Sequence, residues 1–477
     1  ADEGSASRPP AVRSSASQAV KAPSVLLNGV THPIPTTFRH QTTTYRILTA
    51  DGGVTGQFDR VRSNFAFLSP WLSYDTNTVS LTLVQTGALH SAAVTSNQLN
   101  VADAIGALGL GSPLFQAVIG QSEVGARQAF DALSGEAHAS ASTTAYTGAS
   151  LIQTTLASRL RTTLSSSAFN LVQDVYPAAF AADLPGAASQ TVDVPVRSLD
   201  PRHFILWGEG FGSWGKLDGS ATAAGLDTST SGFILGAEAK LDQSYRFGLA
   251  GGFTRATVDV DTRLSFGSNE SVFGALYGSA SWGSLSLRLG TSFAAHDIDL
   301  QRTVQFSGFA EAVSASYSGW TAQAFAEVGY RLDLGDVQLE PFVGASLLRV
   351  HTDAFQESGG AAALTGFAQH QDLGTTTLGL RAETRLGEEV PLTVRGLLGW
   401  HHAYGDVVPS ALLAFGNDVS TFMVSGTPVN RDALMVEAGL EWQASQAISL
   451  SVAYEGQIGS QAQQHALKAN FVWRFGT

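Results

Sequence analysis

The sequence predicts an all-β membrane protein, whose C-terminal part is an antiparallel transmembrane β-barrel of about twelve strands. From about Phe204 onward, segments of roughly 10 to 15 residues alternate apolar and polar side chains, as a strand with two unlike faces does. The last segment, HALKANFVWRF from His465 to Phe475, puts its aromatic side chains on one face. In water that face would have to be covered, whereas lipid accepts it. No uninterrupted apolar run of about 18 residues occurs, so no transmembrane helix is predicted.

Composition argues against several classes of function. The 477-residue chain has a formal net charge of -13, so nucleic acid is not an expected partner. Only 14% of its residues are charged, which is low for a soluble protein. The chain contains no cysteine, which excludes disulfides, thiolate metal ligands and cysteine nucleophiles. A chain that crosses a narrow pore unfolded would lack disulfide loops, although chance or lineage bias explains the absence equally well.

The N-terminal part is predicted to precede the barrel as two short segments. Residues 1–44 are rich in Ser, Ala and Pro and are expected to be weakly ordered. Their polar start, ADEGSASRPPAVRSS, is expected to be a mature N-terminus after cleavage or a trimmed one. Residues 45–95 contain short β-prone runs separated by turn signals, which predicts a small β segment. At the other end, residues 476–477 follow the aromatic pattern and are expected to be a vector remnant.

Residues 96–202 are predicted to form a helical linker region. The stretches NQLNVADAIGALG, SEVGARQAFDAL and SLIQTTLASRLRTTL carry apolar residues at three- and four-residue spacing, and Ser122 can cap the second helix. The third stretch is mostly Thr, Ser, Ala and Gln, so it suits the inside of a polar tube better than an ordinary core. We therefore predict a pore helix at about residues 135–165. Residues 166–200, rich in Ala, Ser and Pro, are expected to be the linker to the barrel.

Residues 203–475 are predicted to be the barrel. Apolar strand faces meet Trp or Tyr near strand ends, as an aromatic girdle does. Short connections alternate with long ones at residues 299–315, 351–372 and 405–431, as periplasmic turns alternate with outer loops. The polar faces carry both signs of charge, which predicts either ion pairs that hold the linker helix or a selective ion path. The predicted lumen charges are Arg288, Glu327, Arg381, Glu383, Glu437 and Glu441.

A large soluble β-sandwich or barrel would produce the same alternation of side chains. It explains the aromatic last strand and the alternating loop lengths less well, so the membrane barrel is the preferred prediction.

Four stretches together resemble the autotransporters, the type V secretion proteins of Gram-negative bacteria. LTADGGVTGQFDRV with FLSPWLSYDTNTVSLTL resembles the end of a passenger β-helix, where the passenger is the N-terminal part carried to the cell surface. NQLNVADAIGALG with ARQAFDALSGEAHAS is similar to the region that joins passenger to barrel, and Leu133-Ser134-Gly135-Glu136 is its recognisable core. ILWGEGFGSWG resembles the first barrel strand, and NFVWRF resembles the closing strand.

The resemblance implies an outer-membrane protein with a twelve-stranded barrel, a helix through its pore, a short β-helix-like passenger remnant and an N-terminal region at the cell surface. It implies that the last strand both faces lipid and is read as an assembly signal by the barrel-assembly machinery. Its residues are Leu467, Phe471, Trp473 and Phe475. Outer-membrane lipid and periplasmic chaperones are further implied partners, and the barrel is expected to be monomeric. Fewer than a hundred residues precede the linker, so the passenger is expected to be short or to have lost its N-terminal part.

Other motifs are better explained by structure than by chemistry. The run from Gly208 to Gly212 mimics a nucleotide loop, but strands flank it, so close backbone packing is expected. His351, His401, His402 and Asp406 fit no strong metal-ligand spacing and are expected to be solvated loop residues. Ser134 has no recognisable base, and no catalytic triad, metal or cofactor is predicted.

The sequence therefore predicts an outer-membrane translocator that carries its own N-terminal passenger to the cell surface, and not an enzyme. The alternative is a porin-like channel with an N-terminal plug or periplasmic region.

Overall fold

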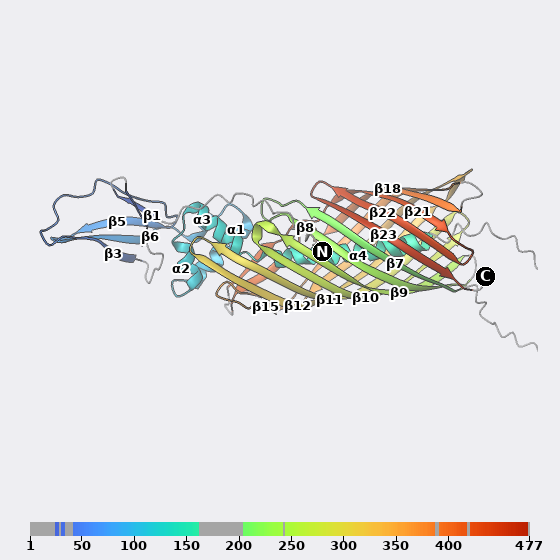
Figure 1. Ribbon diagram of the computed structural model, residues 1–477, viewed down its shortest axis with the longest axis horizontal. Coiled ribbons are helices and arrows are strands. Elements are labelled where there is room, and N and C mark those ends of the chain that lie inside the picture. Colours follow the sequence, from blue (N-terminus) through green and yellow to red (C-terminus); the bar gives the residue numbers. More distant parts are fainter. Residues whose placement is uncertain are drawn as a thin grey trace, which may run out of the picture. The chain divides into compact units, whose positions relative to one another are not determined.

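The computed structural model describes residues 24–27, 30–33, 42–161, 204–241, 244–386, 391–416 and 420–475 (Figure 1). Most of the predicted N-terminal segment, the predicted linker at 166–200 and residues 476–477 therefore lie outside the described residues. The chain divides into two compact units. The N-terminal unit comprises residues 1–94, 98–133 and 305–310, and the barrel unit comprises residues 95–97, 134–304 and 311–477.

The N-terminal unit contains two antiparallel three-stranded sheets. One has the order β2-β1-β4 and the other β3-β6-β5, in which the alternation of β6 buries Val79, Leu81 and Leu83. Antiparallel pairing differs from the parallel stacking of successive β-helix coils, so the predicted β-helix-like segment takes the form of antiparallel sheets. The strands are β1 (Ser24–Leu27), β2 (Val30–Pro33), β3 (Thr42–Thr49), β4 (Val61–Ser63), β5 (Leu68–Tyr74) and β6 (Thr78–Gln85).

Short helices follow these sheets, and their sequence signals are local. The 3-10 helix η1 (Leu89–Ala92) precedes α1 (Ser96–Leu108), α2 (Pro113–Ile119) and α3 (Glu123–Leu133). The side chain of Ser122 accepts a hydrogen bond from Gly125 N at 3.2 Å, which is the predicted cap of α3. Ser112 caps α2 in the same way by accepting from Leu114 N, and Pro113 suits its first turn. The seven-residue α2 was absent from the sequence prediction because it is too short to show a helical period.

The barrel unit is a closed antiparallel sheet, which confirms the predicted fold class. Thirteen strands follow one another in hydrogen-bond order, and β12 also pairs with β14 to close the ring. Because the three-residue β13 pairs only with β14, twelve strands form the wall. These are β7 (Phe204–Leu217), β8 (Leu226–Lys240), β9 (Tyr245–Val260), β10 (Ser265–Trp282), β11 (Leu285–Phe306), β12 (Phe309–Tyr330), β14 (Val337–Thr352), β17 (Gln369–Arg385), β18 (Leu392–Gly405), β21 (Asp432–Gln443), β22 (Ile448–Gly459) and β23 (Ala462–Arg474), with β13 at Leu332–Leu334 and the 3-10 helix η4 at Asp261–Arg263.

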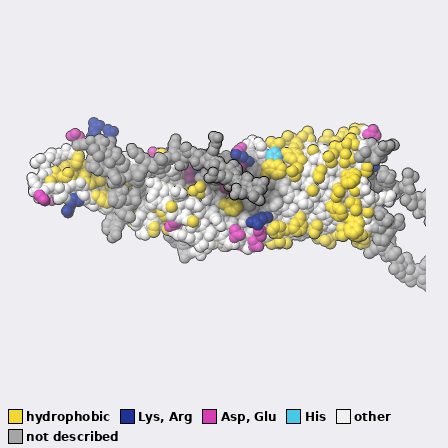
Figure 2. Space-filling view, viewed as in Figure 1, with side chains coloured by type: hydrophobic (Ala, Val, Ile, Leu, Met, Phe, Trp, Pro, Cys, Tyr) yellow, Lys and Arg dark blue, Asp and Glu magenta, His cyan; other side chains and the backbone are white. Residues whose placement is uncertain are grey.

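The outer wall of the barrel is apolar, as the strand alternation predicts. Large hydrophobic side chains such as Leu235, Phe247 and Leu276 are exposed there. On the face seen in Figure 2, hydrophobic side chains gather in a broad band over the barrel. Such a surface fits a hydrocarbon environment. Within the described residues, no helix combines the length and the apolar character needed to cross a bilayer.

Two of the three predicted long loops fold into a second, smaller sheet. The four strands β15 (Phe355–Gln356), β16 (Leu364–Gly366), β19 (Ser410–Phe415) and β20 (Thr421–Ser425) lie in the connections 351–372 and 405–431 and pair in the order β15-β16-β19-β20. The third predicted loop, 299–315, is wrong. Strands β11 and β12 run through it and leave only Ser307 and Gly308 between them, with a positive φ of 79° at Gly308.

Glycines let large inward side chains lie close to the wall, and Gly252 gives a test of this. An added Cβ at Gly252 would overlap the carbonyl oxygen of Phe233 and lie 2.8 Å from Phe273 Cζ, whereas one at Gly274 would meet nothing within 4 Å. We expect Gly252→Ala to lower the free energy of unfolding by about 1–3 kcal/mol because it overpacks the wall. Denaturant unfolding in lipid vesicles measures this, and Gly274→Ala on the next strand is the control. Equal stability of both variants would refute the packing role.

Candidate functional site

Helix α4 (Glu136–Arg161) lies inside the barrel (Figure 1). Thr144 accepts a hydrogen bond from β10 and Thr155 donates one to β7, while Arg159 and Arg161 reach β8 and β21. Because these strands are distributed around the ring, the helix occupies the lumen. Its partners on the wall include Asn269, Glu209, Glu238, Glu437, Gln323, Gln371, Glu455, Lys468 and His401.

The composition of α4 matches its surroundings. Its N-terminal half, residues 137–145, is built from Ala, Ser and Thr apart from His138, and all nine of these side chains are buried. Its C-terminal half adds Leu151, Ile152, Leu156 and Leu160, which pack with Trp207, Phe211 and Phe273 of the wall. The helix spans Glu136–Arg161, which lies within the range of about 135–165 given for the pore helix, although its Ala/Ser/Thr half carries almost no hydrophobic signal.

The N-terminal end of α4 is fastened by Glu136, one of the residues of the predicted joining motif. Its buried carboxylate accepts hydrogen bonds from Ala224 N at 2.9 Å, Arg263 Nε at 2.8 Å and Asn97 Nδ2 at 3.1 Å. Ser134 Oγ accepts from Glu136 N at 3.3 Å and so caps the helix. These contacts connect the helix to two hairpin ends of the barrel.

Leu133 and Gly135, the other residues of this motif, have packing roles. Leu133 ends α3 and is fully buried. Gly135 has φ +66°, and an added Cβ would overlap Leu364 Cδ1 and lie 3.0 Å from Leu413 Cδ1. The motif thus needs glycine both for its backbone conformation and for the approach of the small sheet.

A second fastening joins α4 to the connection between β14 and β17. His138 Nε2 lies 2.7 Å from Glu357 Oε1, and Arg302 donates to the same carboxylate at 2.7 and 2.6 Å. Tyr317 Oη lies 3.1 Å from His138 Nδ1. A neutral imidazole fits both contacts, because Nε2–H donates to the carboxylate while Nδ1 accepts from the tyrosine.

Glu357 lies between β15 and β16, outside the membrane-spanning strands, and its ionisation is coupled to this fastening. Although burial disfavours its charge, the charge and hydrogen bonds of Arg302, with the hydrogen bond of His138, hold the pKa of Glu357 well below its usual range. A depressed folded-state pKa contributes stability that is present above the unfolded-state pKa of about 4.3 and is lost as pH falls through the folded value.

We therefore expect Glu357→Gln to reduce the free energy of unfolding at pH 7 and to cost progressively less as pH falls below about 4. Unfolding of both proteins in lipid vesicles at pH 7 and pH 3 measures this. A difference between wild type and variant that is the same at both pH values would contradict the role of the charged carboxylate.

The C-terminal half of α4 is held by ion pairs. Arg159 donates to Glu238 Oε1 at 2.8 Å and Oε2 at 3.2 Å, and both side chains are almost completely buried. Arg161 donates to Glu437 at 3.2 Å. The run Gly208–Gly212 is part of strand β7, as predicted from its flanking strands. Its glutamate, Glu209, faces the lumen and accepts a hydrogen bond from Thr155 at 2.6 Å.

The wall carries a further network of predicted lumen charges. Glu327 accepts hydrogen bonds from Arg288 at 2.9 Å and from Arg381 at 2.5 Å. Both arginines also donate to Glu340, at 2.8 and 2.9 Å. Arg381 lies over the ring of Phe342, 3.4 Å from its centroid. On neighbouring strands Arg395 pairs with Glu441 and lies 3.4 Å from Glu383.

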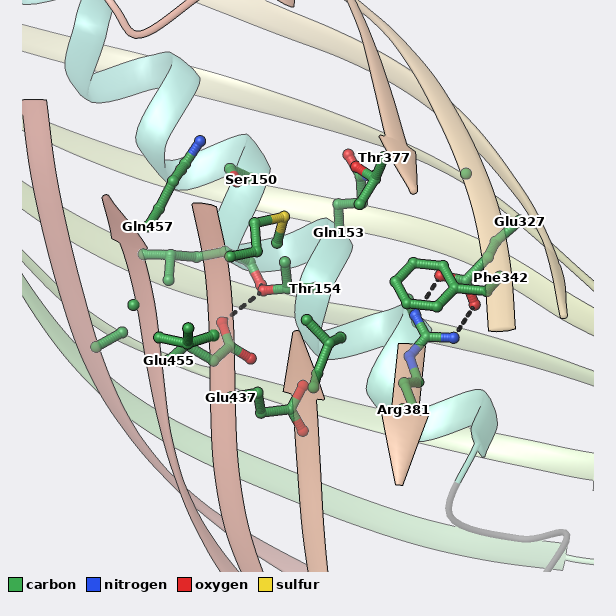
Figure 3. A pocket seen from close by; sticks show the side chains of 18 of the residues that line it. Ser150, Gln153, Thr154, Glu327, Phe342, Thr377, Arg381, Glu437, Glu455 and Gln457 are labelled. Carbon is green, nitrogen blue, oxygen red and sulfur yellow. Dashed lines mark hydrogen bonds and ion pairs between the residues drawn. The ribbon is translucent and has the colours of Figure 1, made fainter. Parts of the chain in front are cut away.

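A cavity of about 90 Å³ remains beside α4. Figure 3 shows Ser150, Gln153 and Thr154 of the helix on one side of it and Glu437, Glu455 and Gln457 of the wall on another. Thr154 donates to Glu455 at 3.1 Å across this space. The lining is mixed, because apolar side chains such as Leu151, Phe325 and Met435 lie beside these polar ones.

The residues predicted as the assembly signal lie along the outer face of the last strand and just after it. Leu467, Phe471 and Trp473 are exposed on β23, with exposed fractions of 43% or more. Phe475 follows the strand and packs on Trp473 with ring centroids 4.3 Å apart. Strand β23 pairs with β7 and closes the ring.

Histidine environments differ from the sequence expectation. His401 is buried and lies 3.1 Å from Thr377 Oγ1 and 3.4 Å from Tyr146 Oη of α4, so it is not a solvated loop residue. Alternation along β18 turns it toward the lumen. In the part of the chain that the structure describes, no group of three or more His, Cys, Asp or Glu side chains could hold a metal ion.

Comparison with known proteins agrees with this arrangement. A family model described as "Autotransporter beta-domain" matches residues 206–455. Two proteins of Serratia marcescens named "Extracellular serine protease" are each 31% identical, over 448 and 455 residues. Each alignment covers 90% of this chain and 43% of the relative, so the chain spans less than half the length of these curated relatives.

Solved structures with related folds include the translocator domain of autotransporter NalP from Neisseria meningitidis. It is 16% identical with a TM-score of 0.48, and the match covers 58% of this chain and 90% of that one. The transport unit of autotransporter AIDA-I from Escherichia coli is 15% identical with a TM-score of 0.42, covering 60% of this chain and 94% of that one.

Proposed function

Because this chain belongs to the autotransporter family, with the β-domain matched over residues 206–455, we propose that α4 is the trailing end of a passenger path that it occupies after secretion. The barrel is an outer-membrane translocator for a passenger exposed at the cell surface. The observation that supports the proposal is the bonding of α4 to strands around the whole ring, including Glu209, Glu238 and Glu437. A helix in that position is continuous with whatever passed through the lumen before it.

The chemistry of transport in this proposal is conformational. The closed wall satisfies its own backbone groups and leaves no edge in lipid. The lumen offers charged and hydroxyl side chains, which can exchange partners with a passing polypeptide. When α4 reaches its final position, Glu136 at its start binds Ala224 and Arg263, and Arg159 near its end binds Glu238. These contacts then hold the helix in the lumen.

The partners and cargo proposed for this chain follow from the family. The outward aromatic row of β23 would be read by the barrel-assembly machinery, with periplasmic chaperones keeping the unfolded barrel soluble. The relatives are named extracellular serine proteases, which makes a protease a candidate passenger, while the barrel itself is proposed to be non-enzymatic. A porin-like channel is less consistent with a lumen occupied by a bonded helix.

An epitope tag after Ser7, followed by external protease treatment of intact cells, tests the proposed topology. Removal of the tag while residues 204–475 survive is the expected result. Protection of the tag until the outer membrane is broken would place the N-terminal part in the periplasm and would overturn the proposal. The control for folding is the mobility of the barrel on gels, because a folded barrel migrates faster before heating than after it.

A further inference from the structure

We propose that the barrel binds a phosphate group through Lys240, Arg246 and Arg474, at the lumen wall beside the ends of β8, β9 and β23. Lys240 and Arg246 are direct partners across the β8–β9 pair. Ile205 of β7 faces inward and lies between two strands. Its direct partner on β23 is Arg474, and its direct partner on β8 is Glu238. The register therefore gathers three cationic side chains on one inner patch, which is here called the cationic patch.

Among the residues that the structure describes, the cationic patch has too little negative charge to match its cations. Like charges directly opposite each other on neighbouring strands are unfavourable, and Lys240 faces Arg246 in that way. The nearby carboxylate, Glu238, is already held by two hydrogen bonds from Arg159, and its oxygen lies 3.8 Å from Arg246 Nη1. In this corner of the described structure, four cations face one carboxylate.

Arg246 gives independent support for a missing anion. Its side chain is 5% exposed, and its Nε and Nη1 atoms are buried with no acceptor within hydrogen-bond distance in the part of the chain that the structure describes. Nη1 of Arg474 is in the same situation. Buried guanidinium N–H groups without an acceptor are costly, so an oxyanion between them would satisfy donors that the protein leaves open.

A phosphate group fits this patch better than a carboxylate does. It presents three or more acceptor oxygens and up to two negative charges, which can serve two guanidinium forks and one ammonium group together. Two sources share this chemistry, free phosphate and a phospholipid headgroup. Tyr245 and Trp282 pack together on the outer surface beside these strand ends, and such aromatic side chains mark the depth of lipid headgroups.

The experiment uses the full chain folded in nanodiscs of phosphatidylcholine. Titration with sodium phosphate at constant ionic strength is followed by calorimetry, with sodium chloride as reference. In a second arm, nanodiscs contain phosphatidylglycerol, and native mass spectrometry counts lipids retained by the barrel. Lys240→Gln and Arg246→Gln are compared with Lys216→Gln and Arg255→Gln, which remove the same charges from exposed positions on β7 and β9.

Each patch variant is expected to weaken phosphate-group binding about tenfold, while the exposed controls leave it unchanged. Response to sodium phosphate alone identifies the free ion, and retained phosphatidylglycerol alone identifies the headgroup. Lys240→Arg keeps the positive charge and is expected to keep phosphate-group binding. It therefore distinguishes a loss of binding caused by the lost charge from one caused by misfolding. No response of the wild type to either source, or binding that survives in both patch variants, would overturn the proposal.

Discussion

Glu327→Ala is expected to destabilise the folded barrel by about 3–5 kcal/mol. Glu327 is the shared acceptor of Arg288 and Arg381, and its removal leaves Glu340 alone to serve both guanidinium groups. Arg288 is 1% exposed, so water cannot replace the missing carboxylate. Breaking a buried ion pair from one side is costly for this reason, whereas the intact pair contributes little on balance.

Unfolding by urea in lipid vesicles, followed by the gel shift of the folded barrel, measures this loss. Glu270→Ala is the matched control, because Glu270 pairs with Arg255 at 3.3 Å while both side chains remain about half exposed. Such an exposed pair contributes about 0–1 kcal/mol. Similar losses for both variants would show that Glu327 has no special place in the wall.

Arg159→Glu is expected to raise the ion conductance of the barrel severalfold by displacing the C-terminal half of α4. Arg159 lies in contact with Glu238, and both are shielded from water. The substitution replaces an attraction with a repulsion of about 4 kcal/mol for two charges roughly 4 Å apart in surroundings of intermediate polarity. Other polar contacts of this half, made by Gln153, Thr154, Thr155 and Arg161, are hydrogen bonds to wall side chains, and none is a bidentate ion pair like that of Arg159 with Glu238.

Single-channel recording in planar bilayers measures the conductance of wild type and variant. Arg255→Glu on the outer surface is the control, because it reverses the same charge away from the lumen. Conductance that stays at the wild-type level in a folded Arg159→Glu barrel would mean that α4 is held by its apolar face alone, through Leu156 and Leu160.

Much of the barrel could be predicted because strand alternation is a local signal. Phe233 and Leu235 face outward and Arg288 and Glu327 inward, in agreement with their positions in the period of two. The total of twelve strands follows from counting such segments. Trp207 contradicts a simple expectation of outward aromatics, because it faces inward and donates to Tyr277 at 2.7 Å. Gly236, on the neighbouring strand, leaves room for its ring.

The ion-pair partners could not be predicted, because they depend on the register and stagger of the closed ring. Glu340 and Glu238 are not among the predicted lumen charges, although both lie within the predicted barrel, residues 203–475. Arg302, Glu357 and His138 come from three distant segments that meet only when the loops fold over the lumen. The position of Glu357 depends on the pairing of β16 with β19. Neither segment alone carries a sequence signal for that pairing, so Glu357 could not be predicted.

The pairing of β7 with β23 has a kinetic consequence. Ile205 and Arg474 lie at opposite ends of the barrel sequence, yet they are direct partners, and Phe475 N donates to Phe204 O at 3.2 Å. Every other neighbouring pair of wall strands is consecutive in the chain among the twelve, so the contact between β7 and β23 joins the strands that are farthest apart in sequence. Contacts of such sequence separation form slowly. The ring therefore remains an open sheet until its last strand pairs with its first.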